Sequence, residues 1–156
     1  MEEISMKKLL SLLVTILLIV SMAGTVSAAE TTTTENIVYF EDGSYLVTTI
    51  VQSASRSSQT TSGSARKTFV DSNGNTCWQA NLTGTFTYDG TTATCTKSTI
   101  EVNIYDSTYY TVSKTATKTG ATATGEFTIG QTFLGITIAK NTYNLALTCD
   151  KNGTLS

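Results

Sequence analysis

Threonine alternates with apolar residues along most of this chain, and pairs of turn-forming residues interrupt the alternation at short intervals. Four such pairs each separate two alternating runs: Asp42-Gly43, Asn73-Gly74, Asp89-Gly90 and Thr119-Gly120. An alternation with a period of two places successive side chains on opposite faces of a β-strand, and a two-residue pair ending in glycine is typical of a tight hairpin. The chain is therefore predicted to consist of antiparallel hairpins.

The alternating runs predict about eight strands and almost no helix. The strands are expected at 36–41, 44–52, 66–71, 76–88, 92–105, 109–118, 121–129 and 136–149, the last with a break near Lys140 left open. Short strands with one apolar face each favour two packed antiparallel sheets, an all-β, immunoglobulin-like sandwich. A small closed barrel is the alternative, because periodicity does not distinguish sheets that stack from a sheet that closes.

The first 28 residues are interpreted as a secretory signal peptide. Lys7 and Lys8 form its basic start, Leu9–Val20 form its apolar run, and small residues precede a cleavage site near Ala28. The apolar run is shorter than the roughly 20 residues that a membrane-spanning helix needs. The mature protein is therefore expected to be secreted into the extracellular space, with no stable membrane insertion after cleavage.

The remaining chain is long enough for one domain with its own core. Residues 29–35 are predicted to be a flexible arm and residues 36–156 a single β-sandwich domain, in which the polar segment Ser53–Ser64 is expected to be a mobile loop. The net charge of the chain is only −2, and the sequence has no basic cluster. Nucleic-acid binding is therefore not expected.

The mature part contains three cysteines, and strand parity suggests which two are bonded. Cys149 shares its parity with Leu147, and Cys95 is expected opposite Gly84, where the missing side chain leaves room for a bridge. Cys77 has the parity of polar neighbours and is expected on the outer face. We therefore predict a Cys95–Cys149 disulfide with Cys77 as a free thiol, as an oxidising exterior permits. Three free thiols in a reducing environment are the alternative.

The composition removes several kinds of catalytic site. The chain contains no histidine, which excludes Ser-His-Asp and Cys-His arrangements and the usual zinc sites. Glu41, Asp42, Asp71 and Asp89 fall at turns, where acids accept local hydrogen bonds. Glu101 and Glu126 are the only acids expected within strands, and a carboxylate pair is the basis of a weaker hypothesis, a glycoside hydrolase. We expect a non-enzymatic protein with no metal and no cofactor.

Four aromatic residues are candidate ligand contacts: Trp78, Tyr105, Tyr109 and Tyr110. Aromatic rings can stack on sugar rings, although aromatic residues are also expected in strands as core residues. The leading hypothesis is a binding or surface-interaction module for cell-wall or host glycans. A structural or self-associating extracellular protein is the competing hypothesis, because the chain has no proline to block its edge strands.

Three parts of the mature chain carry a resemblance: 39–45 (YFEDGSY), 84–88 (GTFTY) with 93–95 (ATC), and 147–149 (LTC) with 152–156 (NGTLS). On these residues the chain resembles small secreted all-β proteins of Gram-positive anaerobes, a group with no assigned activity. The resemblance implies export, a β fold and a Cys95–Cys149 bridge, with Cys77 as an addition to the pattern.

Overall fold

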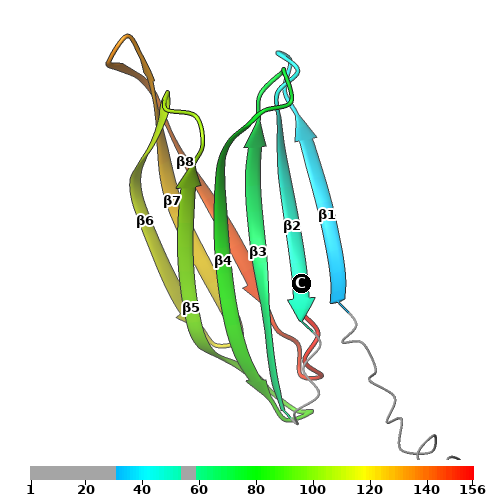
Figure 1. Ribbon diagram of the computed structural model, residues 1–156. Coiled ribbons are helices and arrows are strands. Elements are labelled where there is room, and N and C mark those ends of the chain that lie inside the picture. Colours follow the sequence, from blue (N-terminus) through cyan, green and yellow to red (C-terminus); the bar gives the residue numbers. More distant parts are fainter. Residues whose placement is uncertain (1–30, 54–58) are drawn as a thin grey trace, which may run out of the picture.

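Eight antiparallel strands make up the part of the chain that the computed structural model describes, residues 31–53 and 59–156 (Figure 1). The predicted signal peptide lies outside the described residues. The strands are β1 (Thr31–Tyr39), β2 (Tyr45–Ser53), β3 (Thr60–Val70), β4 (Thr76–Tyr88), β5 (Ala93–Ile104), β6 (Tyr109–Thr119), β7 (Thr122–Phe133) and β8 (Ile136–Thr148).

The strands form two sheets that pack face to face. The larger sheet has the order β1-β2-β3-β4-β5 and the smaller sheet the order β6-β7-β8. The predicted β-sandwich is therefore confirmed, and the barrel alternative is wrong, because the two sheets do not close on each other. Within the described residues, β1 and β2, β3 and β4, β4 and β5, β6 and β7, and β7 and β8 are joined by short turns, as the hairpin pattern predicts.

Aromatic rings from both sheets form the centre of the core. Counting outward from the Asn73-Gly74 turn predicts Phe69 opposite Trp78, and the two residues do pair across β3 and β4. Their stacked rings have centroids 5.8 Å apart. Phe127 meets the Trp78 ring edge-on at 5.6 Å and stacks on Tyr143 at 5.5 Å. Pairs of this kind add to the free energy gained from burying their apolar area. This cluster fixes the two sheets against each other.

The two sheets differ in width, and this decides where the molecule is open. The smaller sheet packs on β3, β4 and β5, whereas β1 and β2 extend beyond it. Figure 1 shows these two strands at one side of the larger sheet, past the strands of the smaller one. β8 is the edge of the smaller sheet on this side. Among the described residues, no strand of the smaller sheet covers the inner face of β1 and β2.

The N-terminal arm departs from the prediction. β1 begins at Thr31, so the described part of the predicted arm (29–35) is strand. Residues Thr31–Glu35 pair with Thr49–Ser53 at the end of β2. A run of threonines suits a strand because β-branched side chains pack well on a pleated surface. The sequence pattern was ambiguous here because the run has no apolar face.

The predicted Ser53–Ser64 loop is also partly strand, because β3 begins at Thr60; residues 54–58 lie outside the described part of the chain. Small residues at alternate positions point inward, and Gly63 and Ala65 are buried. A Cβ atom on Gly63 would collide with the side chain of Leu155 and stand 2.6 Å from a backbone oxygen. Close packing therefore requires the small residues that made this segment resemble a loop.

The predicted disulfide is not formed in this structure, in which Cys95 and Cys149 are free. Both point inward as predicted, with 4% and 2% of their surface exposed. The loop after β4 spans Asp89–Thr92 rather than two residues, so Cys95 lies opposite Phe86 instead of Gly84. The Phe86 ring fills the space beside Gly84, only 2.6 Å from where a Cβ atom would stand. The expected room for a bridge is therefore occupied.

Cys77 lies in the core, and its predicted place on the outer face is wrong. Its exposed fraction is 2%. Phe69 pairs with Trp78 and Val70 pairs with Thr76, which leaves Cys77 as the extra residue of a β-bulge. A bulge shifts the alternation of side chains by one position and so reverses the face of the residue concerned. Burial raises the pKa of this thiol, as it does for the other two cysteines.

Candidate functional site

A groove of about 610 Å³ opens where the larger sheet extends past β8. Its floor is the inner face of β1, β2 and β3, and its opposite wall comes from β7, β8 and the start of β6. The residues that line it are Val38, Phe40, Asp42, Ser44, Leu46, Phe69, Trp78, Tyr109, Ile129, Gln131, Asn141, Thr142 and Tyr143. The volume is within the usual range for a small-ligand site.

Strand register accounts for the apolar floor of the groove. Val38 pairs with Leu46, and Leu46 pairs with Phe69, so these three side chains share one face of the sheet. Phe40 follows at the end of β1 and meets the Phe69 ring edge-on at 6.3 Å. Val38 is 51% exposed and Phe40 44% exposed. Apolar side chains at this level of exposure form a surface on which a ligand can be buried.

The aromatic core forms the deep end of the groove. Trp78 is only 1% exposed, so it offers no free ring face. The Tyr109 ring meets the Phe69 ring edge-on at 5.9 Å, and its hydroxyl group accepts a hydrogen bond of 3.3 Å from Nε2 of Gln131. Desolvation, assisted by nearby Cys77 and Asp106, raises the pKa of Tyr109 to about 12. Tyr109 is therefore a neutral hydrogen-bonding group at physiological pH.

A polar rim borders the apolar floor. Asp42 accepts hydrogen bonds from both the hydroxyl group of Ser44 (2.6 Å) and its backbone N–H (3.0 Å). These bonds, the hydroxyl first, lower the pKa of the carboxyl group. Asn141 and Thr142 supply polar atoms from β8. An apolar groove with a few polar groups at its edge is suited to binding.

The aromatic residues proposed from the sequence do not form one platform. Trp78 and Tyr109 both line the groove. Tyr110 follows Tyr109 in β6 and points to the opposite face of the smaller sheet, where its hydroxyl group lies 2.9 Å from that of Thr137. Tyr105 follows β5 and is 60% exposed outside the groove. The groove therefore contains half of the proposed set.

Sequence reasoning missed several residues of the groove, among them Phe40, Phe69 and Tyr143. The apolar residues on both faces of the first two strands were a usable signal, since they indicated a large apolar surface near the N-terminus. The unequal width of the sheets was not visible in the sequence. Without it, an apolar inner face is indistinguishable from an ordinary covered core.

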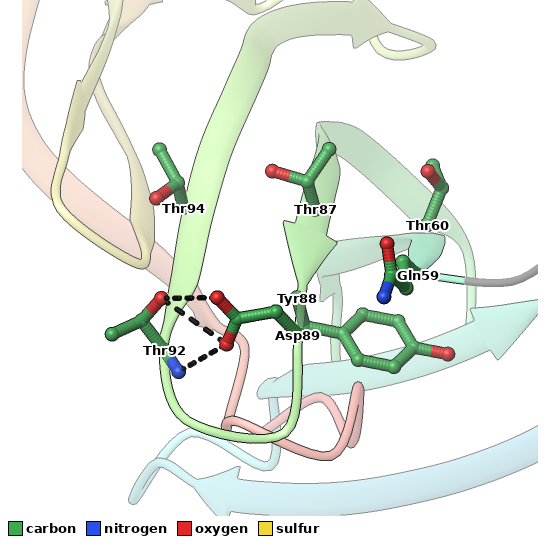
Figure 2. A pocket seen from close by; sticks show the side chains of 7 residues that line it. All are labelled: Gln59, Thr60, Thr87, Tyr88, Asp89, Thr92 and Thr94. Atoms are coloured by element: carbon green, nitrogen blue, oxygen red, sulfur yellow. Dashed lines mark hydrogen bonds between the residues drawn. The ribbon is translucent and has the colours of Figure 1, made fainter.

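A second, smaller hollow of about 330 Å³ lies at the other end of the sandwich, beside the β4–β5 loop (Figure 2). Its lining residues are Gln59, Thr60, Thr87, Tyr88, Asp89, Thr92 and Thr94. Asp89 accepts hydrogen bonds from the backbone of Thr91 and Thr92. These bonds, that of Thr92 first, lower the pKa of the carboxyl group. Asp89 is thus engaged in holding its own turn, as predicted for the turn acids.

The two acids of the hydrolase hypothesis are not brought together. Glu101 lies on β5 opposite Asn81, on the outer face of the larger sheet, and Glu126 lies on the outer face of the smaller sheet. Both are exposed. Packed sheets lie about 10 Å apart, and these side chains point away from each other, so they cannot flank one glycosidic bond.

Within the described residues, no cluster of three metal-ligating side chains occurs. The same part of the chain has no helix with the length and apolarity needed to cross a bilayer. Comparisons with protein-family models, with curated proteins and with solved structures find no match to this chain.

Proposed function

We propose that the mature protein is an extracellular, non-enzymatic binding module that holds its ligand in the groove beside β8. One observation carries this proposal: β1 and β2 extend past β8, and there the described residues leave a largely apolar space of ligand size beside the aromatic core. Exposed apolar surface with a polar rim is a common mark of an interaction site. The predicted signal peptide would place this module outside the cell, where it would meet its ligand.

The shape of the groove favours an inserted apolar group over a flat sugar ring. Stacking on a sugar requires an exposed aromatic face, and Trp78 is almost completely buried. Phe40, on the floor, is 44% exposed, and Tyr109, at the deep end, is half-buried. Cell-wall or host glycans remain within the proposal as ligands to be tested, and they would have to enter the groove rather than lie across a platform.

Neighbouring tyrosines provide a matched test of the binding site. A glycan array and a panel of short peptides would be screened with the full mature chain, using the fluorescence of Trp78, its only tryptophan. We expect Tyr109→Ala to weaken binding of any hit about tenfold or more, whereas Tyr110→Ala, on the opposite face, leaves it unchanged. Equal effects of the two variants, or no hit in either screen, would contradict the proposal.

Self-association is a second candidate, favoured by the tip of the β7–β8 hairpin. Its apolar side chains are 59–86% exposed: Phe133, Leu134, Ile136 and Ile138. Leu134 also has a positive φ of 50°, a conformation that non-glycine residues adopt infrequently. Size-exclusion chromatography of the wild type and Leu134→Asn over a range of concentrations tests this candidate. A monomer at every concentration would remove it.

A further inference from the structure

We propose that the groove is an acceptor site for one extended polypeptide segment of another protein. The segment would pair with β8 as a fourth strand of the smaller sheet and place alternate side chains on the inner face of β1 and β2. This inference rests on the proposed function and names its ligand class. Strand addition of this kind combines main-chain hydrogen bonds with side-chain pockets.

The backbone of β8 has free hydrogen-bonding groups on this side. The N–H of Cys149 donates to the backbone oxygen of Ala121, so the odd-numbered residues of β8 face β7. Thr148 exchanges two hydrogen bonds with Ser156 on the other edge, so the even-numbered residues face outward. By this alternation the N–H and C=O groups of Lys140 and Thr142 point into the groove. No strand in the described part of the chain lies beside them.

The C-terminal tail already uses the same edge in the proposed way. Beyond its pairing with Thr148, the tail makes an isolated antiparallel bridge between Leu155 and Cys149. Leu155 is 8% exposed and packs in the core, whereas Ser156 is exposed. Gln52 of β2 holds the tail through its side chain, donating to the backbone oxygen of Gly153 (2.6 Å) and accepting from the N–H of Leu155 (3.0 Å). The tail thus occupies the fourth-strand position at one end of the sandwich.

Lys67 separates the tail from the groove. Its Nζ atom donates a hydrogen bond of 3.1 Å to the backbone oxygen of Asn144, and it lies 5.9 Å from the centre of the Tyr143 ring. Beyond this lysine the fourth-strand position is vacant, and the groove begins. The tail, Lys67 and the groove therefore follow one another along a single edge, of which only the last part is without a partner in the described residues.

The width of the vacant position suits a single strand. Strands in a sheet lie about 4.8 Å apart, and the larger sheet extends past β8 by two strands, β1 and β2. A single strand beside β8 would be covered by this extension, and its inward side chains would meet Val38, Phe40 and Leu46. The position alongside Lys140–Asn144 suits about five residues. These should alternate between apolar side chains facing the floor and polar ones facing solvent.

Capped heptapeptides that alternate threonine with valine, leucine or phenylalanine are the probe for this site. Binding to the full mature chain would be followed by the fluorescence of Trp78, which lines the groove. Thr142→Pro removes one outward N–H without removing a bond to β7, because proline is tolerated where the N–H faces away from the ladder. Thr128→Val is the control, since it removes the hydroxyl contact between Thr128 and Thr142 on the outer face of the smaller sheet and leaves the N–H groups of β8 in place.

We expect Thr142→Pro to weaken peptide binding about tenfold and Thr128→Val to change it by less than about twofold. N-methylation of the threonine nitrogens of the peptide should cause a similar loss, because these groups face β8 in an antiparallel pairing. This second measurement does not depend on how the proline variant folds.

The outcomes separate this inference from the proposed function. Peptide binding that survives both N-methylation and Thr142→Pro would overturn strand addition but leave a ligand-binding groove. The same holds if no peptide of the panel binds at about 1 mM while a glycan binds in a Tyr109-dependent manner. If neither class of ligand binds, both proposals fall.

Discussion

Aspartate is the residue that fixes the ends of this sandwich. Asp42, Asp71, Asp89, Asp106 and Asp150 each accept a hydrogen bond from the backbone N–H two positions further on. The carboxylate thereby replaces a missing partner at the turn and sets its geometry. The sequence analysis predicted this role for Asp42, Asp71 and Asp89, and the hydrogen bonds confirm it for these three residues. These carboxylates therefore have a structural role in the turns.

Asp71 should contribute stability that depends on pH. Hydrogen bonds from Asn75, its backbone N–H first, lower the pKa of the Asp71 carboxyl group. A lowered pKa in the folded state means that the contribution is present above the unfolded pKa of about 3.9 and is lost as the pH falls through the folded value. Urea unfolding should show Asp71→Ala to be less stable than wild type at pH 7, with a smaller difference at pH 2.

Glu41→Ala, an exposed neighbour of a turn, is the control. A difference that persists unchanged at pH 2 would contradict this role.

Strand existence and most side-chain faces could be predicted from alternation, whereas register could be predicted only in part. Next to its turn the β4–β5 hairpin is shifted by two positions relative to the prediction, which keeps the residues there on their predicted faces, so Cys95 still points inward. Beyond the bulge between Thr85 and Phe86 the shift is three positions. At Cys77 a single extra residue reverses the face, and the prediction is wrong. Bulges and loop lengths depend on contacts with distant strands. For this reason they were not visible in the local pattern.

The C-terminal tail acts as an additional element of the smaller sheet. Leu155→Ala should lower the free energy of unfolding by about 2 kcal/mol or more, because it removes buried apolar atoms beside Gly63 and leaves a cavity. Thr154→Ala alters an exposed neighbour in the same segment and should change stability by less than about 0.5 kcal/mol. Urea unfolding of both variants gives the comparison. Equal effects would show that the tail is not anchored by Leu155.

At the scale of the whole molecule, the defining property is the difference in width between the two sheets. Five strands face three, the tail fills one end of the position that a fourth strand would take, and the groove is the other end. Alternation predicted two sheets, but it carries no information about how many strands each sheet receives. The residues of the groove were therefore identifiable as apolar in the sequence, and their shared opening became evident only in three dimensions.

Amide hydrogen exchange along β8, followed residue by residue by NMR, tests this account most directly. Outward N–H groups without a partner exchange faster than those in a ladder. We predict fast exchange at Lys140 and Thr142, slow exchange at Asn141 and Tyr143, which pair with β7, and protection at Thr148, which pairs with the tail. Uniform protection from Lys140 to Thr148 would contradict the open edge on which the acceptor site depends.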